Sequence, residues 1–118
     1  IFSARYAGRT SPDQRTNDEA NNDLLLKNMQ PLKGEDRTAY YVSSIALASP
    51  DGELHCCVED RCYGLILEQR RGDGGFGYDP LFMVREYHQT FAELPLAVKS
   101  AISHRGRALR QFIEKLRF

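Results

Sequence analysis

The glycine-rich stretch from Arg71 to Phe82 holds the residues whose types and spacing are best suited to bind a ligand. It reads Arg-Gly-Asp-Gly-Gly-Phe-Gly-Tyr-Asp-Pro-Leu-Phe. Glycine reaches backbone angles that are closed to other residues, and it lets a ligand approach the main chain. The stretch also carries two aromatic rings and a carboxylate, on Phe76, Tyr78 and Asp79, which a plain linker does not need. We interpret it as a ligand-binding loop, and the alternative is a flexible hairpin loop.

The glycine spacing, Gly72-x-Gly74-x-x-Gly77, formally matches the dinucleotide-binding fingerprint, but its context contradicts that match. The fingerprint must open a helix, so that the helix N-terminus meets the pyrophosphate. Here Pro80 follows shortly after Gly77, and no apolar helix comes next. The protein-kinase version needs a valine two residues after the last glycine and a strand lysine beyond it. Neither residue is present.

A second candidate group lies near the C-terminus, where Ser103, His104 and Arg105 stand at the start of a predicted helix. The free N–H groups of a helix N-terminus, together with a histidine and an arginine, suit an anion or a carbonyl oxygen. A capped surface helix with solvated charges is the simpler interpretation of these three residues alone. Lys99, five residues before His104, could face the same site or point into water. The other basic residues of this helix are interpreted as a solvated face: Arg107, Arg110, Lys115 and Arg117.

The elements that must position these residues follow from periodicity and turn signals. Apolar spacing predicts a helix over 17–29, with Asp18 and Glu19 in its first turn. The segment 38–49 has apolar groups on both faces, which predicts a central strand covered on both sides. A capping-box pattern joins Thr90 to Glu93, and Ser103 is predicted to cap the last helix. The further expected elements are strands over 54–58 and 62–69, a short extended piece over 80–84, and helices from Pro95 to about 102 and over 104–116. This order predicts an α/β fold with a mixed β-sheet flanked by helices.

Length and composition limit the function classes. A chain of 118 residues fits a single domain. Acidic and basic residues number 16 each, so the net charge of zero argues against a general nucleic-acid binder. No apolar run has the length of a membrane span. The crowded cysteines, Cys56, Cys57 and Cys62, are interpreted as small apolar strand residues and not as a disulfide framework. They weakly favour a reducing, cytoplasmic setting.

Four segments in order carry a resemblance to a known family: Phe-Ser-Ala-Arg-Tyr-Ala-Gly at 2–8, Gly-Gly-Phe-Gly-Tyr-Asp-Pro-Leu-Phe at 74–82, Thr-Phe-Ala-Glu-Leu at 90–94, and Lys-Ser-Ala-Ile-Ser-His-Arg-Gly-Arg-Ala-Leu at 99–109. Together they resemble the C-terminal part of the inosine triphosphate pyrophosphatase family, also called XTP/dITP pyrophosphatases. The resemblance covers essentially the whole chain. It implies an ITPase-like fold and a purine nucleoside triphosphate as substrate. Family members use Mg2+ to hydrolyse ITP, dITP and XTP to the monophosphate and pyrophosphate. They are cytoplasmic and commonly homodimeric.

The resemblance also implies roles for seven residues of this chain. Phe76, Gly77, Tyr78 and Asp79 would hold the nucleobase. Lys99 would bind the substrate, and His104 and Arg105 would close the base pocket. An aromatic ring such as Phe76 can stack on a purine, because every base offers a π face. Hypoxanthine and xanthine present an O6 acceptor and an N1–H donor, so a pocket built for this pair would leave polar groups unpaired against adenine.

The family's phosphate-binding segment, its metal-binding glutamate and its catalytic aspartate all precede the Ser-Ala-Arg motif, where this chain begins. We therefore expect residues 1–118 to be the C-terminal portion of a single ITPase-like domain, with the Mg2+ ligands and the catalytic residues upstream. Such a chain would lack catalysis alone and would expose an apolar edge or face. Its other available carboxylates, Asp13, Asp18 and Asp73, are interpreted as surface groups. Glu59-Asp60 replaces a common glycine and could alter a turn.

Two alternatives stay open. The chain could be a non-catalytic purine nucleotide-binding module, which would explain the missing phosphate segment. The arginine-bearing last helix could instead contact nucleic acid, although the zero net charge counts against this hypothesis.

Overall fold

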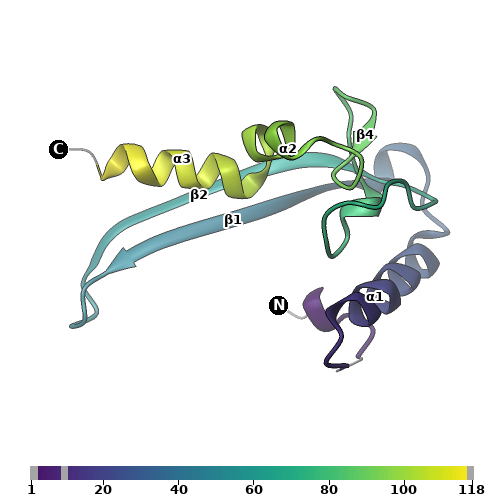
Figure 1. The fold of residues 1–118 in the computed structure, drawn as a ribbon, viewed down its shortest axis with the longest axis horizontal. Helices are drawn as coiled ribbons and strands as arrows, with labels where there is room; N and C mark the ends of the chain where they lie inside the picture. Colours follow the sequence, from purple (N-terminus) through teal and green to yellow (C-terminus); the bar gives the residue numbers. More distant parts are fainter. Residues whose placement is uncertain (1–2, 9–10, 117–118) are drawn as a thin grey trace. The chain divides into compact units, whose positions relative to one another are not determined.

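The computed structural model describes residues 3–8 and 11–116 (Figure 1). The chain divides into two compact units, one of residues 1–39 and 64–94 and the other of residues 40–63 and 95–118. We describe each unit by itself. The elements are η1 (Ser3–Arg5), α1 (Gln14–Met29), η2 (Gly34–Arg37), β1 (Thr38–Ala48), β2 (Leu54–Ile66), η3 (Asp79–Leu81), β3 (Phe82–Val84), β4 (Gln89–Thr90), α2 (Leu96–Ile102) and α3 (His104–Lys115).

The predicted α/β class is confirmed, with the four strands in the order β1-β2-β3-β4. The end of β2 pairs antiparallel with β3, with Leu65 opposite Met83, and β3 pairs antiparallel with β4. The expected second and third strands, 54–58 and 62–69, are one continuous strand, β2. Glu59 and Asp60 lie inside it, so they form no turn. All three cysteines lie on β2 as free thiols, as the sequence indicated.

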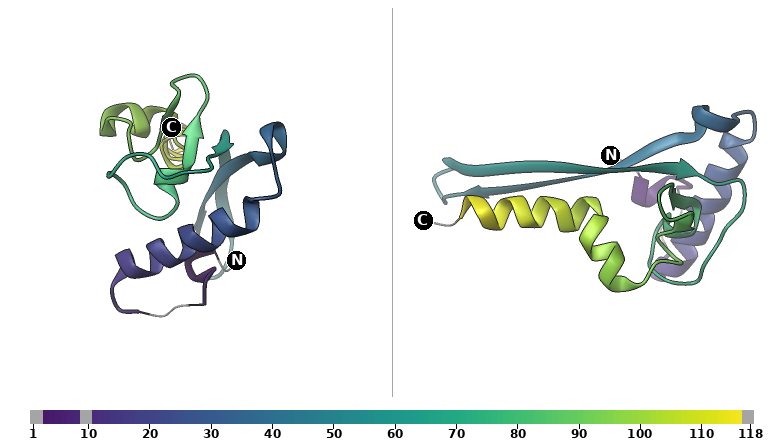
Figure 2. Two further views of the ribbon diagram at one scale, coloured as in Figure 1. Left: turned by 90° about the vertical axis from the view of Figure 1, so that its right-hand side faces the viewer. Right: turned by 90° about the horizontal axis from the view of Figure 1, so that it is seen from above.

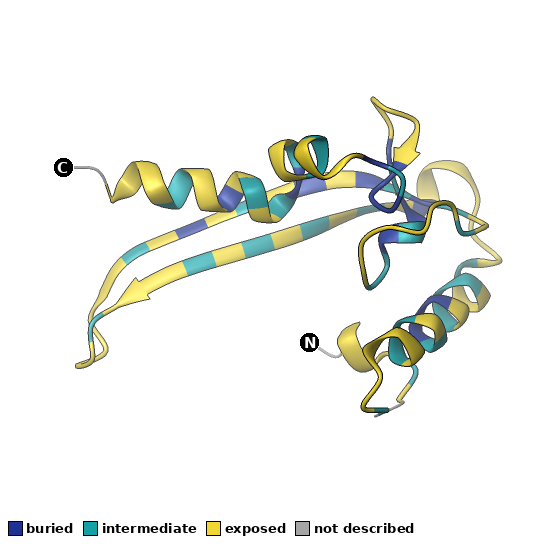
Figure 3. Ribbon diagram, viewed as in Figure 1, coloured by how far each residue is buried: buried dark blue, intermediate teal, exposed yellow. Residues whose placement is uncertain are grey.

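The expectation that the first long strand is covered on both sides is wrong for this chain. Along β1 the half-buried residues alternate with exposed ones up to Ile45, and no residue of the strand is fully buried (Figure 3). The strand is first in the sheet order, so one of its edges has no strand neighbour among the described residues. Large apolar side chains are exposed on β1, β2 and α3, as expected for an apolar face: Tyr40, Val42, Leu47, Leu54, Tyr63, Leu109 and Ile113.

The core of the first unit forms where β2, β3 and the segment after β4 meet. Phe82 and Phe91 are almost fully buried, and their ring centroids lie 4.9 Å apart. Gly64 allows β2 and β3 to approach each other closely, because a Cβ there would lie 2.5 Å from the Met83 carbonyl oxygen. This core supports the glycine-rich stretch, which directly follows β2 in the chain.

Helix α1 begins earlier than predicted and is held by polar contacts. Asp13 caps it, accepting from the Arg15 N–H, so Asp13 is not simply a solvated carboxylate. Because the helix begins at Gln14, Asp18 falls in its second turn. Its buried residues are two amides, Asn21 and Asn22. The apolar residues of the helix are only half-buried: Ala20, Leu24, Leu25, Leu26 and Met29.

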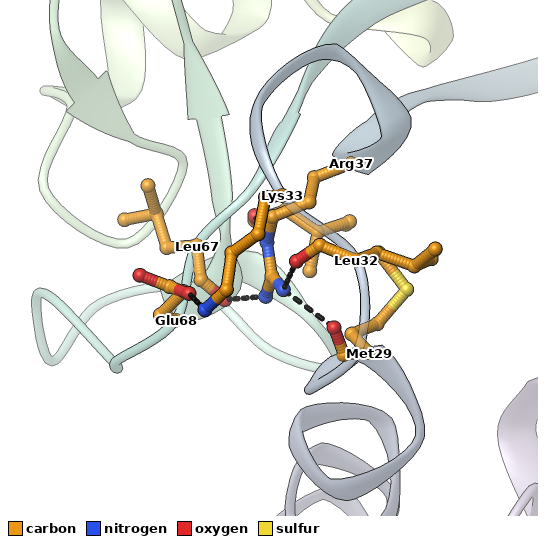
Figure 4. A network of polar contacts seen from close by, with 7 residues as sticks. Met29, Leu32, Lys33, Arg37, Leu67 and Glu68 are labelled. Carbon is orange, nitrogen blue, oxygen red and sulfur yellow. Dashed lines mark hydrogen bonds and ion pairs between the residues drawn. The ribbon is translucent and has the colours of Figure 1, made fainter.

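The guanidinium of Arg37 joins the end of α1 to the end of β2 (Figure 4). It is 4% exposed and donates only to main-chain carbonyls: Nε to Ile66, Nη1 to Met29 and Leu32, and Nη2 to Leu67, at 2.7–3.0 Å. A planar, five-donor group is suited to such a set of acceptors. The arginine thus donates to main-chain carbonyls at the end of the helix and at the end of the strand.

In the second unit α3 runs along the β1–β2 hairpin, and α2 is set at an angle to α3 (Figure 2). Ser103 caps α3, because its hydroxyl accepts from the Gly106 N–H at 3.1 Å. Gly106 lets α2 and α3 come close, since a Cβ there would meet the Ser100 carbonyl oxygen.

Arg107 and Arg110 are exposed, as predicted for a solvated helix face, but their guanidinium groups also contact α2. Arg107 donates to the Ile102 carbonyl at 2.8 Å, and Arg110 donates to the carbonyls of Ser100 and Ala101. The two arginines therefore satisfy the last turn of α2, whose carbonyls have no partner further along that helix. Lys115 is exposed, and Arg117 lies outside the described residues.

Candidate functional site

The glycine-rich stretch is a fixed loop in the first unit. The Arg71 N–H donates to the Pro80 carbonyl at 2.9 Å, and the Gly74 N–H donates to the Ala92 carbonyl at 3.1 Å. The Thr90 hydroxyl donates to the Arg71 carbonyl at 2.7 Å. These bonds tie the loop to β4 and to the segment that follows. They favour the interpretation as a ligand loop over a flexible hairpin, because a preformed loop does not have to be ordered when a ligand binds.

Glu93 strengthens the support beneath this loop. Its carboxylate accepts the Thr90 N–H at 2.9 Å and pairs with Arg71 at 2.9 Å. The hydrogen bond from the Thr90 N–H holds the pKa of Glu93 below its ordinary value, and the contact with Arg71 lowers it further. Half of the predicted capping box therefore forms, but it closes a turn, and the helix α2 begins only at Leu96.

Within the loop, Asp79 acts on the main chain. It is 5% exposed, and its Oδ2 accepts the Phe76 N–H at 3.1 Å. Gly75 has φ +70°, and a Cβ on it would lie 2.1 Å from that same oxygen. Only glycine fits between the carboxylate and the turn.

Phe76 itself projects outward, with 58% of its surface exposed. The next aromatic residue, Tyr78, is half-buried, and its hydroxyl donates to the Ser3 carbonyl. Burial raises the pKa of Tyr78, and the nearby Tyr6 and Asp18 raise it further. The loop thus presents one outward aromatic ring beside a Tyr–Ser contact to the Ser-Ala-Arg motif.

Helix α1 holds both ends of the loop. Arg70, at the entrance, donates to Asp23 at 2.7 Å and to the Glu19 carbonyl at 3.2 Å. Gly77, near the exit, donates its N–H to Asp18 Oδ2 at 2.9 Å and accepts from Asn22 Nδ2 at 3.0 Å. Asp18 is therefore not the solvated surface group that the sequence suggested.

The neighbouring amide, Asn21, holds the Ser-Ala-Arg motif to the same helix. Its Oδ1 accepts the Ala7 N–H at 2.8 Å, and its Nδ2 donates to the Ala4 carbonyl at 3.0 Å. The motif's Phe2 lies outside the described residues. Two motifs far apart in the sequence, Ser3–Gly8 and Phe76–Asp79, therefore meet on one helix.

The other predicted site residues lie in the second unit. Lys99 is half-buried on α2, and His104 and Arg105 open α3. The His104 ring stacks on the Tyr41 ring of β1, with centroids 4.7 Å apart and planes 14° apart. Arg105 is exposed. The structure thus brings Phe76, Gly77, Tyr78 and Asp79 together in one unit, and Lys99, His104 and Arg105 together in the other.

The described residues contain no clustered metal-ligand set. Between residues 3 and 116, apart from 9 and 10, no group of three or more His, Cys, Asp or Glu side chains could hold an ion. Mg2+ is usually held by one or two carboxylates together with water and substrate phosphates, so this finding assigns no Mg2+ ligand among these residues. Over the same residues, no helix combines the length and hydropathy that crossing a membrane requires.

The antiparallel sheet, the helices and the fixed aromatic loop define an α/β protein with a preformed glycine-rich loop. Residues 1–115 match the model described as the Ham1 family, and the chain belongs to this family. The dITP/XTP pyrophosphatase of Rhodopirellula baltica is 46% identical over 116 residues, which are 98% of this chain and 53% of that protein. The dITP/XTP pyrophosphatase of Thermus thermophilus is 48% identical over 114 residues, which are 97% of this chain and 52% of that protein. The family suggested by the sequence motifs is confirmed.

Solved structures give the same result for the fold. A HAM1 protein from Coxiella burnetii has a TM-score of 0.85 and 34% identity, covering 98% of this chain and 56% of that chain. The chain therefore spans about half the length of the relatives it matches.

The residues that sequence reasoning missed are those that hold the loop: Asp18, Asn22 and Arg70. The contacts of Asp18 and Asn22 with Gly77 join residues 59 and 55 positions apart, so local spacing contains no signal for them. One weak signal was available, since two adjacent asparagines inside a helix are poor helix formers and need another reason to be there.

Proposed function

We propose that the full-length protein hydrolyses purine nucleoside triphosphates with deaminated bases, dITP, ITP and XTP, to the monophosphate and pyrophosphate. The names of the relatives support this reaction, because both pyrophosphatases above match this chain over almost its whole length. We further propose that residues 1–118 are the base-recognising C-terminal portion of the domain, and that this portion does not catalyse the reaction alone. A cytoplasmic homodimer that requires Mg2+ and binds no nucleic acid is the expected full-length form.

The observation that carries the proposal is the preformed loop with Phe76 outward and Asp79 inward. A base stacking on an exposed aromatic side chain gains about 1–3 kcal/mol, whichever base it is. Stacking therefore supplies affinity for any nucleotide. Selection of deaminated bases needs hydrogen-bond donors and acceptors. The candidates in the first unit are the main chain of Tyr78 and the second lone pair of the Gly77 carbonyl. The candidates in the second unit are the side chains of Lys99, His104 and Arg105.

The experiment measures pyrophosphate release from dITP by the full-length protein with Mg2+, for Phe76→Ala, Phe76→Tyr and wild type. We expect Phe76→Ala to raise KM about tenfold or more, the effect of losing one stacking contact, and Phe76→Tyr to stay close to wild type. The 118-residue chain alone should release no pyrophosphate. Release of orthophosphate in place of pyrophosphate, or turnover by the isolated chain at the full-length rate, would contradict the proposal.

A non-catalytic nucleotide-binding module is the second candidate. It would be consistent with the lack of a cluster of metal ligands among the described residues. Binding of ITP to the full-length protein without any turnover would support this second function.

A further inference from the structure

The contacts of Gly77 suggest a function for two residues of α1 that no motif contains. Asp18 and Asn22 are four residues apart and therefore project from the same face of the helix. Asp18 accepts the N–H of Gly77 at 2.9 Å, and Asn22 donates to its carbonyl at 3.0 Å. We call this pair the Gly77 clamp. Both main-chain groups of a single loop residue are held by side chains of one helix.

The clamp fixes the peptide planes on either side of Gly77. The Gly77 N–H belongs to the Phe76–Gly77 peptide, and the Gly77 carbonyl belongs to the Gly77–Tyr78 peptide. Gly77 has φ +59°, which glycine adopts without strain. Glycine can also adopt many other backbone conformations, because it has no Cβ. Without the clamp, this residue would be the hinge of the loop.

The other side of Phe76 is fixed as well, because its N–H donates to Asp79 at 3.1 Å. The main chain of Phe76 is thus held on one side by Asp79 and on the other by Asp18. The direction in which the exposed ring projects follows from these two bonds. A change of one peptide plane would reorient the ring and the neighbouring N–H and carbonyl groups.

The burial of Asn22 shows that its amide serves the clamp. The residue is 2% exposed, and its Oδ1 has no hydrogen-bond partner among the described residues. A buried acceptor without a partner destabilises the fold. An apolar side chain at this position would avoid this cost. What asparagine adds is the hydrogen bond from Nδ2 to the Gly77 carbonyl.

We propose that Asp18 and Asn22 are positioning residues for base recognition, setting the orientation of Phe76 and of the Gly77 peptides so that the loop discriminates deaminated purines from adenine. The inference rests on the proposed function. It concerns the selection of the base and not the cleavage of the phosphate chain.

The test compares kcat/KM for dITP with kcat/KM for dATP in variants of the full-length protein. A variant that merely folds less well loses the same fraction of activity with both substrates, so the ratio stays constant. A variant that misplaces the loop changes the ratio. We expect Asn22→Ala and Asp18→Ala to lower the dITP preference about tenfold, the effect of losing one positioning hydrogen bond to a buried group.

Two matched variants sharpen the result. Asp18→Asn keeps an oxygen that can accept the Gly77 N–H, so it should preserve the ratio within about twofold, and Asp18→Ala should not. Asn21→Ala removes a buried amide from the adjacent position, but that amide contacts Ala4 and Ala7. It should lower thermal stability and leave the ratio unchanged.

The outcomes separate the two proposals. A wild-type protein without preference for dITP over dATP would overturn the proposed function itself. A wild-type preference that Asn22→Ala and Asp18→Ala both retain would overturn the clamp alone. An equal shift in Asn21→Ala would also overturn it, because the effect would then belong to the whole helix.

Discussion

Phe76 and Asp79 belong to one short motif, yet the side chain of Phe76 is exposed and that of Asp79 is buried. Phe76 is 58% exposed, whereas Asp79 is 5% exposed and accepts a main-chain N–H. The resemblance to the family assigned both residues to the nucleobase. In this structure the geometry supports a direct contact for Phe76 and a positioning role for Asp79.

Gly75 is the residue on which this arrangement depends most directly. We predict that Gly75→Ala destabilises the protein by about 1–3 kcal/mol through its positive φ alone, and by more because the new Cβ would displace Asp79. Gly52→Ala is the matched control, since Gly52 has φ +90° but no atom within 4 Å of the point where a Cβ would lie. Thermal unfolding and kcat/KM for dITP should both be affected more at Gly75. Equal effects of the two substitutions would contradict the close contact.

Glu93 makes the stability of the loop support depend on pH. The Thr90 N–H and Arg71 lower the pKa of the folded-state carboxyl below its ordinary value of 4.5. The stabilisation is therefore fully present above the unfolded-state pKa and is lost as the pH falls through the lower folded-state pKa. We predict that the Tm of Glu93→Gln falls less steeply than that of wild type between roughly pH 5 and pH 3, measured by circular dichroism. Parallel curves would show that Glu93 has the same pKa folded and unfolded.

Among the elements, α1 is the one that organises the loop. It holds Arg70, Gly77 and the Ser-Ala-Arg motif by hydrogen bonds, and its own C-terminal end is held by Arg37. A shift of this helix would move all three segments together.

Arg37 offers a test of how much the contacts at the end of α1 contribute to the stability of the fold. We predict that Arg37→Lys destabilises the protein by about 3 kcal/mol or more, because a lysine ammonium cannot reach four carbonyls spread in the plane of a guanidinium. Lys33, which lies beside Arg37 in Figure 4, provides the control. Lys33→Ala removes only the exposed ion pair with Glu68, so it should change the free energy of unfolding by less than about 1 kcal/mol. Urea unfolding measures both. Similar losses for the two variants would show that the carbonyl contacts of Arg37 contribute little.

Sequence patterns predicted local features well and long-range polar contacts poorly. The Ser103 cap, the helices after Pro95 and the loop at Arg71–Phe82 follow from turn and capping chemistry that acts over a few residues. The break expected near Glu59 was wrong, because pairing along the hairpin overrides the weak strand preference of two acids. The roles of Asp18, Arg107 and Arg110 could not be predicted, since each depends on a carbonyl or N–H that only the folded chain brings near.

At the scale of the whole molecule, the chain contains a fixed loop, a core beneath it and a helix-borne basic cluster, but it spans about half the length of its relatives. The expected exposure of apolar residues is found on β1, β2 and α3. Our central proposal is that residues 1–118 are the part of a Ham1-family protein that selects the substrate.

The most direct test of that claim is the nucleotide preference of the full-length protein, measured as kcat/KM for pyrophosphate release from dITP and from dATP. A site that pairs with O6 and N1–H leaves buried groups unpaired against adenine, so we predict a preference for dITP of about a hundredfold or more. Equal kcat/KM values for the two nucleotides would contradict the account.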